Sequence, residues 1–364
     1  MPRHVIAFTS ARTAEYLVAG VPAAARALRE VAANAPSADV ECVITTSDAW
    51  TPSAYCQSEC ARLAPSVTLR TTGLATVAGH GATVFLRGED LACGNPRLPS
   101  PYPAAIHPDL GSASLPFEHE RDSLERLEQA GRTVIAATGK PGDGIVSRHL
   151  NRPVSQAISR RLLKIPGITP NQATIGTALL GLAMIASLLL GGQNGLVLGA
   201  LLFQAASIFD GVDGEIARAT WRMSARGAML DSVIDAATNL FFIAGLTANL
   251  AMQGNLDAAS AGTAGLAMLA TGLFLIGRRS RAIGGNFTFD VVKHQVNARP
   301  SRLMQWLTWL TMRDFFAAAG ALLIVAGYAH HALVGFAVCA ALWLVFVLSV
   351  LVRTRPGRPI AAGE

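Results

Sequence analysis

Charged residues are scarce in this sequence. Only 15% of its 364 residues are Asp, Glu, Lys or Arg, whereas 51% are hydrophobic. Soluble globular domains carry about 25% charged residues. The composition therefore excludes an ordinary soluble protein and indicates a chain that lies largely in a membrane. Its length is sufficient for two domains.

Paired cysteines and a long N-terminal apolar run are also missing. The five cysteines show no C-x2-C spacing, and Cys56 and Cys60 have no histidine beside them. This excludes the usual zinc-binding patterns and favours a reducing compartment. The apolar run that opens the chain is too short for a secretory signal. We therefore expect the first domain to be cytoplasmic.

Residues 1–139 have the pattern of an α/β domain. Strand-like and helix-like segments alternate, which predicts a parallel sheet. The layout is similar to the Rossmann-like nucleotidyltransferase domains, which place a glycine-rich phosphate loop and a lysine after the first strand. The corresponding residues 10–22 have no glycine cluster and no lysine. The expected strands are 4–9, 40–45, 82–86 and 133–137, and the expected helices are 21–33 and 118–130.

This N-terminal domain is therefore interpreted as a degenerate, inactive nucleotidyltransferase with a docking or stabilising role. An active cytidylyltransferase is the alternative.

Residues 140–170 form a linker in which Val154, Ile158 and Leu162 recur at helical spacing, with Arg160 and Arg161 on other faces. This pattern predicts an interfacial amphipathic helix that lies against anionic lipid headgroups.

Six hydrophobic segments predict an all-α transmembrane domain over residues 171–355. Residues 1–146 hold 12 Lys and Arg against 15 Asp and Glu, and the rest of the chain holds 18 against 9. The basic residues of this second part alternate with loops that contain none, so the positive-inside rule places both termini in the cytoplasm of an inner (plasma) membrane protein. A cytoplasmic tail follows at 356–364. The expected spans are about 172–190, 195–216, 228–252, 262–277, 314–329 and 332–352.

Four aspartates interrupt the apolar pattern. Residues three or four apart share a helix face, so Asp210 with Asp213, and Asp231 with Asp235, form two pairs. Carboxylates gathered in one space repel each other unless a cation lies among them. Oxygen ligands of this kind suit Mg2+ or Mn2+. The sequence predicts that these four side chains bind metal, with room for two ions.

The residues between the aspartates suit a phosphate-bearing ligand. Gly214, Ala217 and Gly227 remove side-chain bulk, and Arg218 supplies a fixed positive charge. Asp235 lies one helical turn beyond Asp231 on the same face, which makes it the candidate general base for an acceptor hydroxyl. This side of the membrane is the predicted cytoplasmic side.

Together these residues match every fixed position of the motif D-x2-D-G-x2-A-R-x8-G-x3-D-x3-D, from Asp210 to Asp235. The chain resembles the CDP-alcohol phosphotransferase family in this stretch. The resemblance implies that the first three aspartates mainly bind metal and that Asp235 deprotonates the acceptor and shares the metal. It also implies a CDP-linked donor. The predicted CDP-binding residues are Asn171, Thr174, Asp210, Gly214, Ala217, Arg218 and Gly227.

Two of these assignments have an ordinary alternative. Asn171 and Thr174 stand where the first span opens, and capping by Thr169 with Pro170 in the first turn explains the same residues. The basic loop 278–302 contains Arg279 and Arg281, which are the candidate acceptor-binding residues because a phosphorylated acceptor needs such charges. Positive-inside topology alone would also produce them.

The substrates stay open at this point. The pairing of the two domains resembles bifunctional enzymes that make CDP-inositol and couple it to inositol phosphate, which implies a phosphorylated polyol acceptor and a homodimer. A phospholipid synthase using CDP-diacylglycerol is the runner-up. A divalent-cation transporter is the alternative from another class, but residues 236–250 are nearly all apolar after Asn239. We expect membrane lipid as a partner and no nucleic acid.

Overall fold

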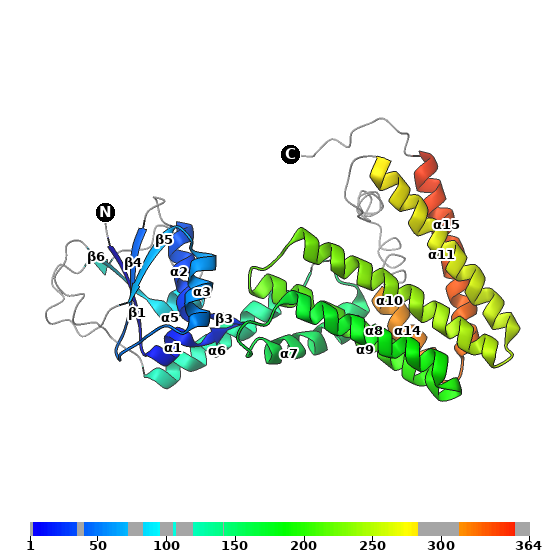
Figure 1. Ribbon diagram of the computed structural model, residues 1–364, viewed down its shortest axis with the longest axis horizontal. Helices are drawn as coiled ribbons and strands as arrows, with labels where there is room; N and C mark the ends of the chain where they lie inside the picture. Colours follow the sequence, from blue (N-terminus) through cyan, green and yellow to red (C-terminus); the bar gives the residue numbers. More distant parts are fainter. Residues whose placement is uncertain are drawn as a thin grey trace. The chain divides into compact units, whose positions relative to one another are not determined.

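The structure is a computed structural model that describes residues 3–34, 40–71, 83–94, 105–106, 119–140, 142–282 and 313–353 (Figure 1). Contacts divide the chain into two compact units. The first unit comprises Met1–Lys140, Gln156–Pro170 and Val212–Met223. The second unit comprises Pro141–Ser155, Asn171–Gly211 and Ser224–Glu364. The division thus crosses both the predicted linker and the aspartate motif.

A mostly parallel sheet forms the centre of the first unit. Its strand order in the described part is β5-β4-β1-β6-β7. Ile6 of β1 pairs with Ile44 of β4 and with Leu86 of β6, both in parallel, whereas β7 runs antiparallel to β6. The strands are β1 (Arg3–Phe8), β4 (Val40–Thr46), β5 (Val67–Thr71), β6 (Thr83–Arg87) and β7 (Ala105–Ile106), and a separate hairpin joins β2 (Leu17–Val18) to β3 (Val21–Pro22).

Helices cover this sheet and complete its core. Ile6, Phe8 and Ile44 from the strands, Leu28 from α2 and Leu127 from α6 are almost fully buried in one cluster. Their burial removes apolar surface from water and is the main stabilising term for this unit. These helices are α1 (Ala11–Glu15), α2 (Ala23–Asn34), α3 (Ala54–Leu63), α5 (Gly88–Ala92) and α6 (Glu120–Ala136); α7 (Arg152–Leu162) begins in the second unit and continues into the first from Gln156.

The strand predicted at residues 133–137 is wrong, because α6 continues to Ala136. The β-branched run of Thr133, Val134 and Ile135 favours a strand by local propensity. Ile135 is instead buried on the helix face that also buries Leu127 and Gly131, at a spacing of one helical turn per step. Packing of that face overrides the local preference. The strands predicted at 4–9, 40–45 and 82–86 are confirmed as β1, β4 and β6.

In the described ranges, five helices are long and apolar enough to cross a membrane. They are α8 (Pro170–Leu190), α9 (Gly192–Ala219), α10 (Ala225–Met252), α11 (Leu256–Ala282) and α15 (Ala329–Arg353). The segment predicted as the fifth of six spans forms α14 (Arg313–Val325), a 13-residue helix. A helix of that length reaches about 20 Å, which is shorter than the roughly 30 Å hydrocarbon core. The described part of the chain thus contains five long apolar helices and one short one.

Small residues let α11 and α15 pack closely. A Cβ atom added to Gly265 would lie 2.8 Å from the ring of Phe336, and one added to Gly272 would lie 2.1 Å from the ring of Trp343. Each pair is seven residues from the next on both helices, so the two aromatic rings fill two glycine-made recesses along one face. Small residues serve this purpose in membrane helix pairs because lipid gives no hydrophobic drive between helices.

Candidate active site

The two aspartate pairs lie on two helices, as the sequence predicts. Asp210 and Asp213 are near the end of α9, and Asp231 and Asp235 are near the start of α10. Asp213 belongs to the first unit and is 6% exposed. The other three belong to the second unit and are half-buried. Within each pair the two aspartates lie three or four residues apart on one helix, as predicted.

The metal role of these aspartates rests on their chemistry. Among the residues that the structure describes, no three His, Cys, Asp or Glu side chains meet in a group that could hold a metal ion. The donor set itself fits the predicted ion, because four carboxylates supply the oxygen ligands that Mg2+ prefers. The ligation of one or two ions by Asp210, Asp213, Asp231 and Asp235 stays a prediction.

Gly214 makes room for the arginine of its own motif. A Cβ atom at Gly214 would lie 3.0 Å from Nη1 of Arg218 one turn later on α9. The Arg218 Nε group donates a 2.8 Å hydrogen bond to the carbonyl oxygen of Thr138, which follows α6 in the first unit. A fixed guanidinium therefore folds over the glycine. Ala217 is half-buried on the same helix.

Gly227 completes the start of α10. The Ser224 hydroxyl oxygen caps this helix by accepting a 3.0 Å hydrogen bond from the Gly227 backbone N–H. A Cβ atom at Gly227 would lie 3.0 Å from that same oxygen. The glycine thus fits a closely approached N-cap, which satisfies one of the free N–H groups of the helix end.

An arginine that the sequence reasoning did not select lies against Gly211, next to Asp210. Arg152 Nη1 is 3.1 Å from the position of a Cβ atom on Gly211. Its guanidinium also makes hydrogen bonds of 2.7 and 3.1 Å to the two carboxylate oxygens of Asp143. Both side chains are nearly buried, at 12% and 13% exposed. No periodic pattern in the sequence marks Arg152, and nine residues separate it from Asp143, so this pair depends on the fold of the junction.

A chain of polar side chains continues from this point within the second unit. Gln204 donates to Asn151 (2.9 Å), Asn151 donates to Ser207 (3.3 Å), and Ser207 donates to Asp314 of α14 (3.0 Å). Asn151 ends a π-helical turn, Ser147–Asn151, that leads directly into α7. Such turns are rare and occur often at functional sites. These bonds connect the junction, α9 and α14 at Ser207, three residues before Asp210 on α9.

The remaining predicted residues are placed as follows. Thr174 is buried in α8, at 3% exposed, whereas Asn171 is exposed. Pro170 is the first residue of α8, in keeping with the capping alternative. Arg279 is half-buried near the end of α11. The side chain of Arg281 lies outside the described residues, as do the basic loop from residue 283 to 302, Trp306, Trp309 and the tail.

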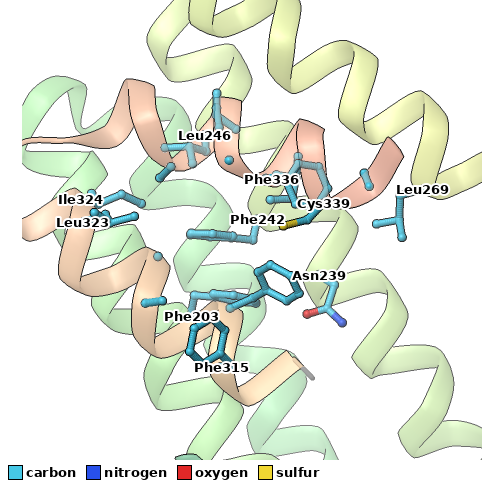
Figure 2. Close-up of a pocket in the computed structure, with 18 of the residues that line it drawn as sticks. Phe203, Asn239, Phe242, Leu246, Leu269, Phe315, Leu323, Ile324, Phe336 and Cys339 are labelled. Atoms are coloured by element: carbon cyan, nitrogen blue, oxygen red, sulfur yellow. The ribbon is translucent and has the colours of Figure 1, made fainter. Parts of the chain in front are cut away.

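An apolar cavity of about 380 Å³ lies within the second unit. Its lining comes from α9, α10, α11, α14 and α15 and is mainly aromatic and aliphatic. The rings of Phe203 and Phe242 stack at 4.0 Å, and Figure 2 shows them with Phe315 and the amide of Asn239. Asn239 lies one helical turn after Asp235 on α10. The cavity therefore lines the same helix face as the candidate base.

The comparison with known families decides the classification. A model of the CDP-alcohol phosphatidyltransferase family matches residues 167–350, which is about half of the chain. The chain belongs to the CDP-alcohol phosphatidyltransferase family. This membership agrees with the five long apolar helices, and the chain is a multi-pass membrane protein. The matched range includes both halves of the aspartate motif and runs from α8 into α15, as far as residue 350.

Several similar proteins share one name. The chain is 40% identical over 124 residues to a bifunctional IPC transferase and DIPP synthase of Thermococcus kodakarensis, covering 34% of this chain and 27% of that protein. The corresponding protein of Archaeoglobus fulgidus is 38% identical over 124 residues, covering 34% and 24%. That of Aquifex aeolicus is 40% identical over 137 residues, covering 37% and 30%. The match spans less than a third of the length of each relative.

Proposed function

We propose that this protein is a CDP-alcohol phosphotransferase that moves a substituted phosphoryl group from a CDP-linked donor to an inositol-phosphate type of acceptor and releases CMP. The observation that carries this proposal is the complete aspartate motif on α9 and α10 within the matched family range. The names of the similar proteins, which refer to an IPC transferase and a DIPP synthase, support the choice of acceptor.

The residues of this chain take defined roles in the reaction. Asp235 accepts the proton of the acceptor hydroxyl, whose oxygen then forms a bond to the donor's distal phosphorus as the bond to the CMP oxygen breaks. Arg218 and the predicted CDP contacts, including Gly214, Ala217 and Gly227, hold the nucleotide. The four aspartates would hold Mg2+ or Mn2+, and such an ion would supply positive charge against the donor diphosphate. Arg279 and Arg281 bind the phosphate of the acceptor.

The wider organisation follows the same proposal. A six-span domain over residues 171–355 works with its termini and motif in the cytoplasm, at the inner membrane, as a homodimer. The N-terminal domain derives from a nucleotidyltransferase. Its strand order around β1 supports this origin, because β5-β4-β1-β6 follows the Rossmann order and puts the ligand crevice at the carboxyl end of β1.

Two acids of the chain bond to the donor groups that follow β1. Buried Glu89 accepts hydrogen bonds from the Thr9 backbone N–H (2.7 Å) and the Thr13 hydroxyl (3.0 Å). Asp48 accepts from the Ala11 N–H at 2.7 Å. Backbone N–H groups in this position are the ones that cradle phosphates in nucleotide-binding folds. A triphosphate would meet negative charge here instead of free donors.

We therefore expect the protein to lack cytidylyltransferase activity. Incubation with CTP, inositol phosphate and Mg2+ should release no pyrophosphate above a protein-free blank, because Glu89 and Asp48 already accept hydrogen bonds from the donors after β1. A coupled pyrophosphate assay measures this, with an active cytidylyltransferase as the positive control. Pyrophosphate release that depends on the protein would show that the domain is active.

A second candidate is a phospholipid synthase that uses CDP-diacylglycerol. The apolar cavity favours it, because its volume falls in the range of ligand pockets and it begins one turn from Asp235. An alkyl chain fits such a lining better than a polyol does. Phospholipid biosynthesis would then be the role of the protein.

The deciding experiment is CMP release by the purified protein with Mg2+. CDP-inositol and CDP-diacylglycerol are compared as donors across a panel of acceptors that includes inositol phosphate. Turnover with CDP-inositol supports the first candidate, and turnover with CDP-diacylglycerol supports the second. If neither donor yields CMP, both are rejected, and a cation-flux assay then tests the transporter alternative.

A cavity-filling variant separates the two candidates independently. Among the described residues, a Cβ atom on Gly320 of α14 would meet nothing within 4 Å, and this glycine lines the cavity. Gly320→Phe should fill the space without a backbone clash. If the donor is lipid-linked, we expect its KM to rise about 10-fold or more, whereas the kinetics with CDP-inositol should not change. An unchanged KM for CDP-diacylglycerol would rule out the cavity as its binding site.

A further inference from the structure

Side chains of the N-terminal α/β part of the first unit hold the connection between α9 and α10 through hydrogen bonds and ion pairs. This connection, Thr220–Ser224, joins the two helices that carry the aspartate motif. We propose that the α/β domain is a positioning element for the motif, in which Arg26, Glu59 and Arg62 fix the end of α9. The inference rests on the proposed phosphotransferase function and gives the degenerate domain a task within it.

Two arginines cap the end of α9. Arg26 is 4% exposed, and its Nη2 group donates a 2.7 Å hydrogen bond to the Ala219 carbonyl oxygen. Arg62 Nη2 donates to the Thr220 carbonyl oxygen at 2.9 Å, and its Nη1 donates to that of Trp221 at 3.3 Å. The last carbonyls of a helix have no partner within the helix and carry its negative dipole charge. Cations from α2 and α3 therefore complete this helix end.

Glu59 on α3 adds two ion pairs to these contacts. Glu59 is 2% exposed and accepts hydrogen bonds from Arg62 (2.6 Å) and from Arg222 of the connection (2.5 Å). Burial alone would raise the pKa of Glu59, but the two guanidinium groups outweigh it and hold this pKa below its usual value. Glu59 is thus a charged, paired group that fastens the connection to α3.

Trp221 is held in an unfavourable backbone conformation between these contacts. Its φ angle is +52°, in the left-handed region that non-glycine residues rarely adopt. The guanidinium groups of Arg26 and Arg29 lie 4.5 and 4.1 Å from the centre of its ring, at the distance of cation–π contacts. Such a conformation persists only where its surroundings enforce it. The α/β domain supplies that enforcement.

Further hydrogen bonds hold the part of α9 that carries the aspartate motif. Ser159 of α7 donates a 2.6 Å hydrogen bond to Glu215, which is fully buried. Arg218 is bonded to the carbonyl oxygen of Thr138, after α6. The α9 segment from Asp213 to Ala219 is therefore tied at three points to the rest of the first unit. A shift at the helix end would move Asp213 and Arg218, which the proposed reaction requires in place.

The test compares Arg62→Leu with the wild-type protein. Leucine cannot bond the Thr220 and Trp221 carbonyls, and the Arg62 side chain is 31% exposed, so the fold should tolerate the change. We expect kcat for CMP release by the folded, gel-filtered protein to fall about 10-fold or more, and amide hydrogen exchange over residues 219–226 to accelerate at least 10-fold. A role in packing alone would lower the melting temperature and leave both values unchanged.

Two further variants guard the interpretation. Exchanging the charges in the double variant Glu59→Arg with Arg222→Glu should restore at least part of the turnover that Glu59→Arg alone removes. Asp90→Asn breaks the Arg126 ion pair elsewhere in the same unit and should leave turnover and exchange unchanged. Wild-type exchange and turnover in Arg62→Leu would overturn the proposal. If the wild-type protein itself releases no CMP, the proposed function fails. The exchange measurement still decides whether the α/β domain holds the connection between α9 and α10 in place.

Discussion

Replacing Asp235 with asparagine should lower the rate of CMP release by about 100- to 10,000-fold, which is the usual contribution of a positioned general base. Asparagine keeps the size of the side chain but cannot accept the acceptor's proton. The residue is half-buried near the start of α10, one turn after Asp231, so the substitution should not disturb packing. Initial rates of CMP release at saturating donor and Mg2+ measure the effect.

A carboxylate outside the motif provides the matched control. Asp257 stands in the first turn of α11 and is exposed. Asp257→Asn makes the same chemical change and should alter the rate less than twofold. Should Asp235→Asn retain more than a tenth of the wild-type rate, Asp235 would not be the base, and the reaction would need another proton acceptor.

The local features of this site could be predicted from the sequence because they depend on short spacing. Two aspartates three or four residues apart lie on one helix face wherever a helix forms, and α9 and α10 do form there. The space left by the small residues could be predicted for the same reason. Gly214 and Gly227 were expected to leave space, and the structure shows what uses it: Arg218 in one case and the Ser224 cap in the other.

Features that join distant parts of the chain could not be predicted in this way. Arg62 is 158 residues before its partner Thr220, and Asn151 is 56 residues before Ser207. In the sequence Arg62 stands in a segment for which no element was predicted, Asn151 stands in the linker, and neither has a periodic signal. The false strand at residues 133–137 has the same cause, since the buried face of α6 is set by its neighbours and not by local propensity.

Gly272→Leu should destabilise the α11–α15 pair strongly. Even the Cβ atom of the new side chain would lie 2.1 Å from the Trp343 ring, well inside contact distance. Either the ring must leave its recess or the helices must separate, and overpacking of this kind costs about 1–3 kcal/mol or more. We expect a lower melting temperature and a smaller monodisperse peak in detergent, measured by gel filtration after heating. CMP release from a lipid-linked donor, per folded molecule, should fall as well, because Trp343 lines the cavity.

Compensation by a second substitution distinguishes a steric clash from a general intolerance of α11 to change. Trp343→Ala removes the ring that the leucine would strike, so the double variant should recover more stability than Trp343→Ala and Gly272→Leu separately predict. Contacting residues show such non-additive effects, whereas distant ones add. Gly254→Leu is unsuitable as a control because its φ of +84° strains any side chain. Ala267→Leu, on the same helix, tests whether added bulk alone destabilises; strictly additive energies in the Gly272–Trp343 cycle would contradict the close packing described for α11 and α15.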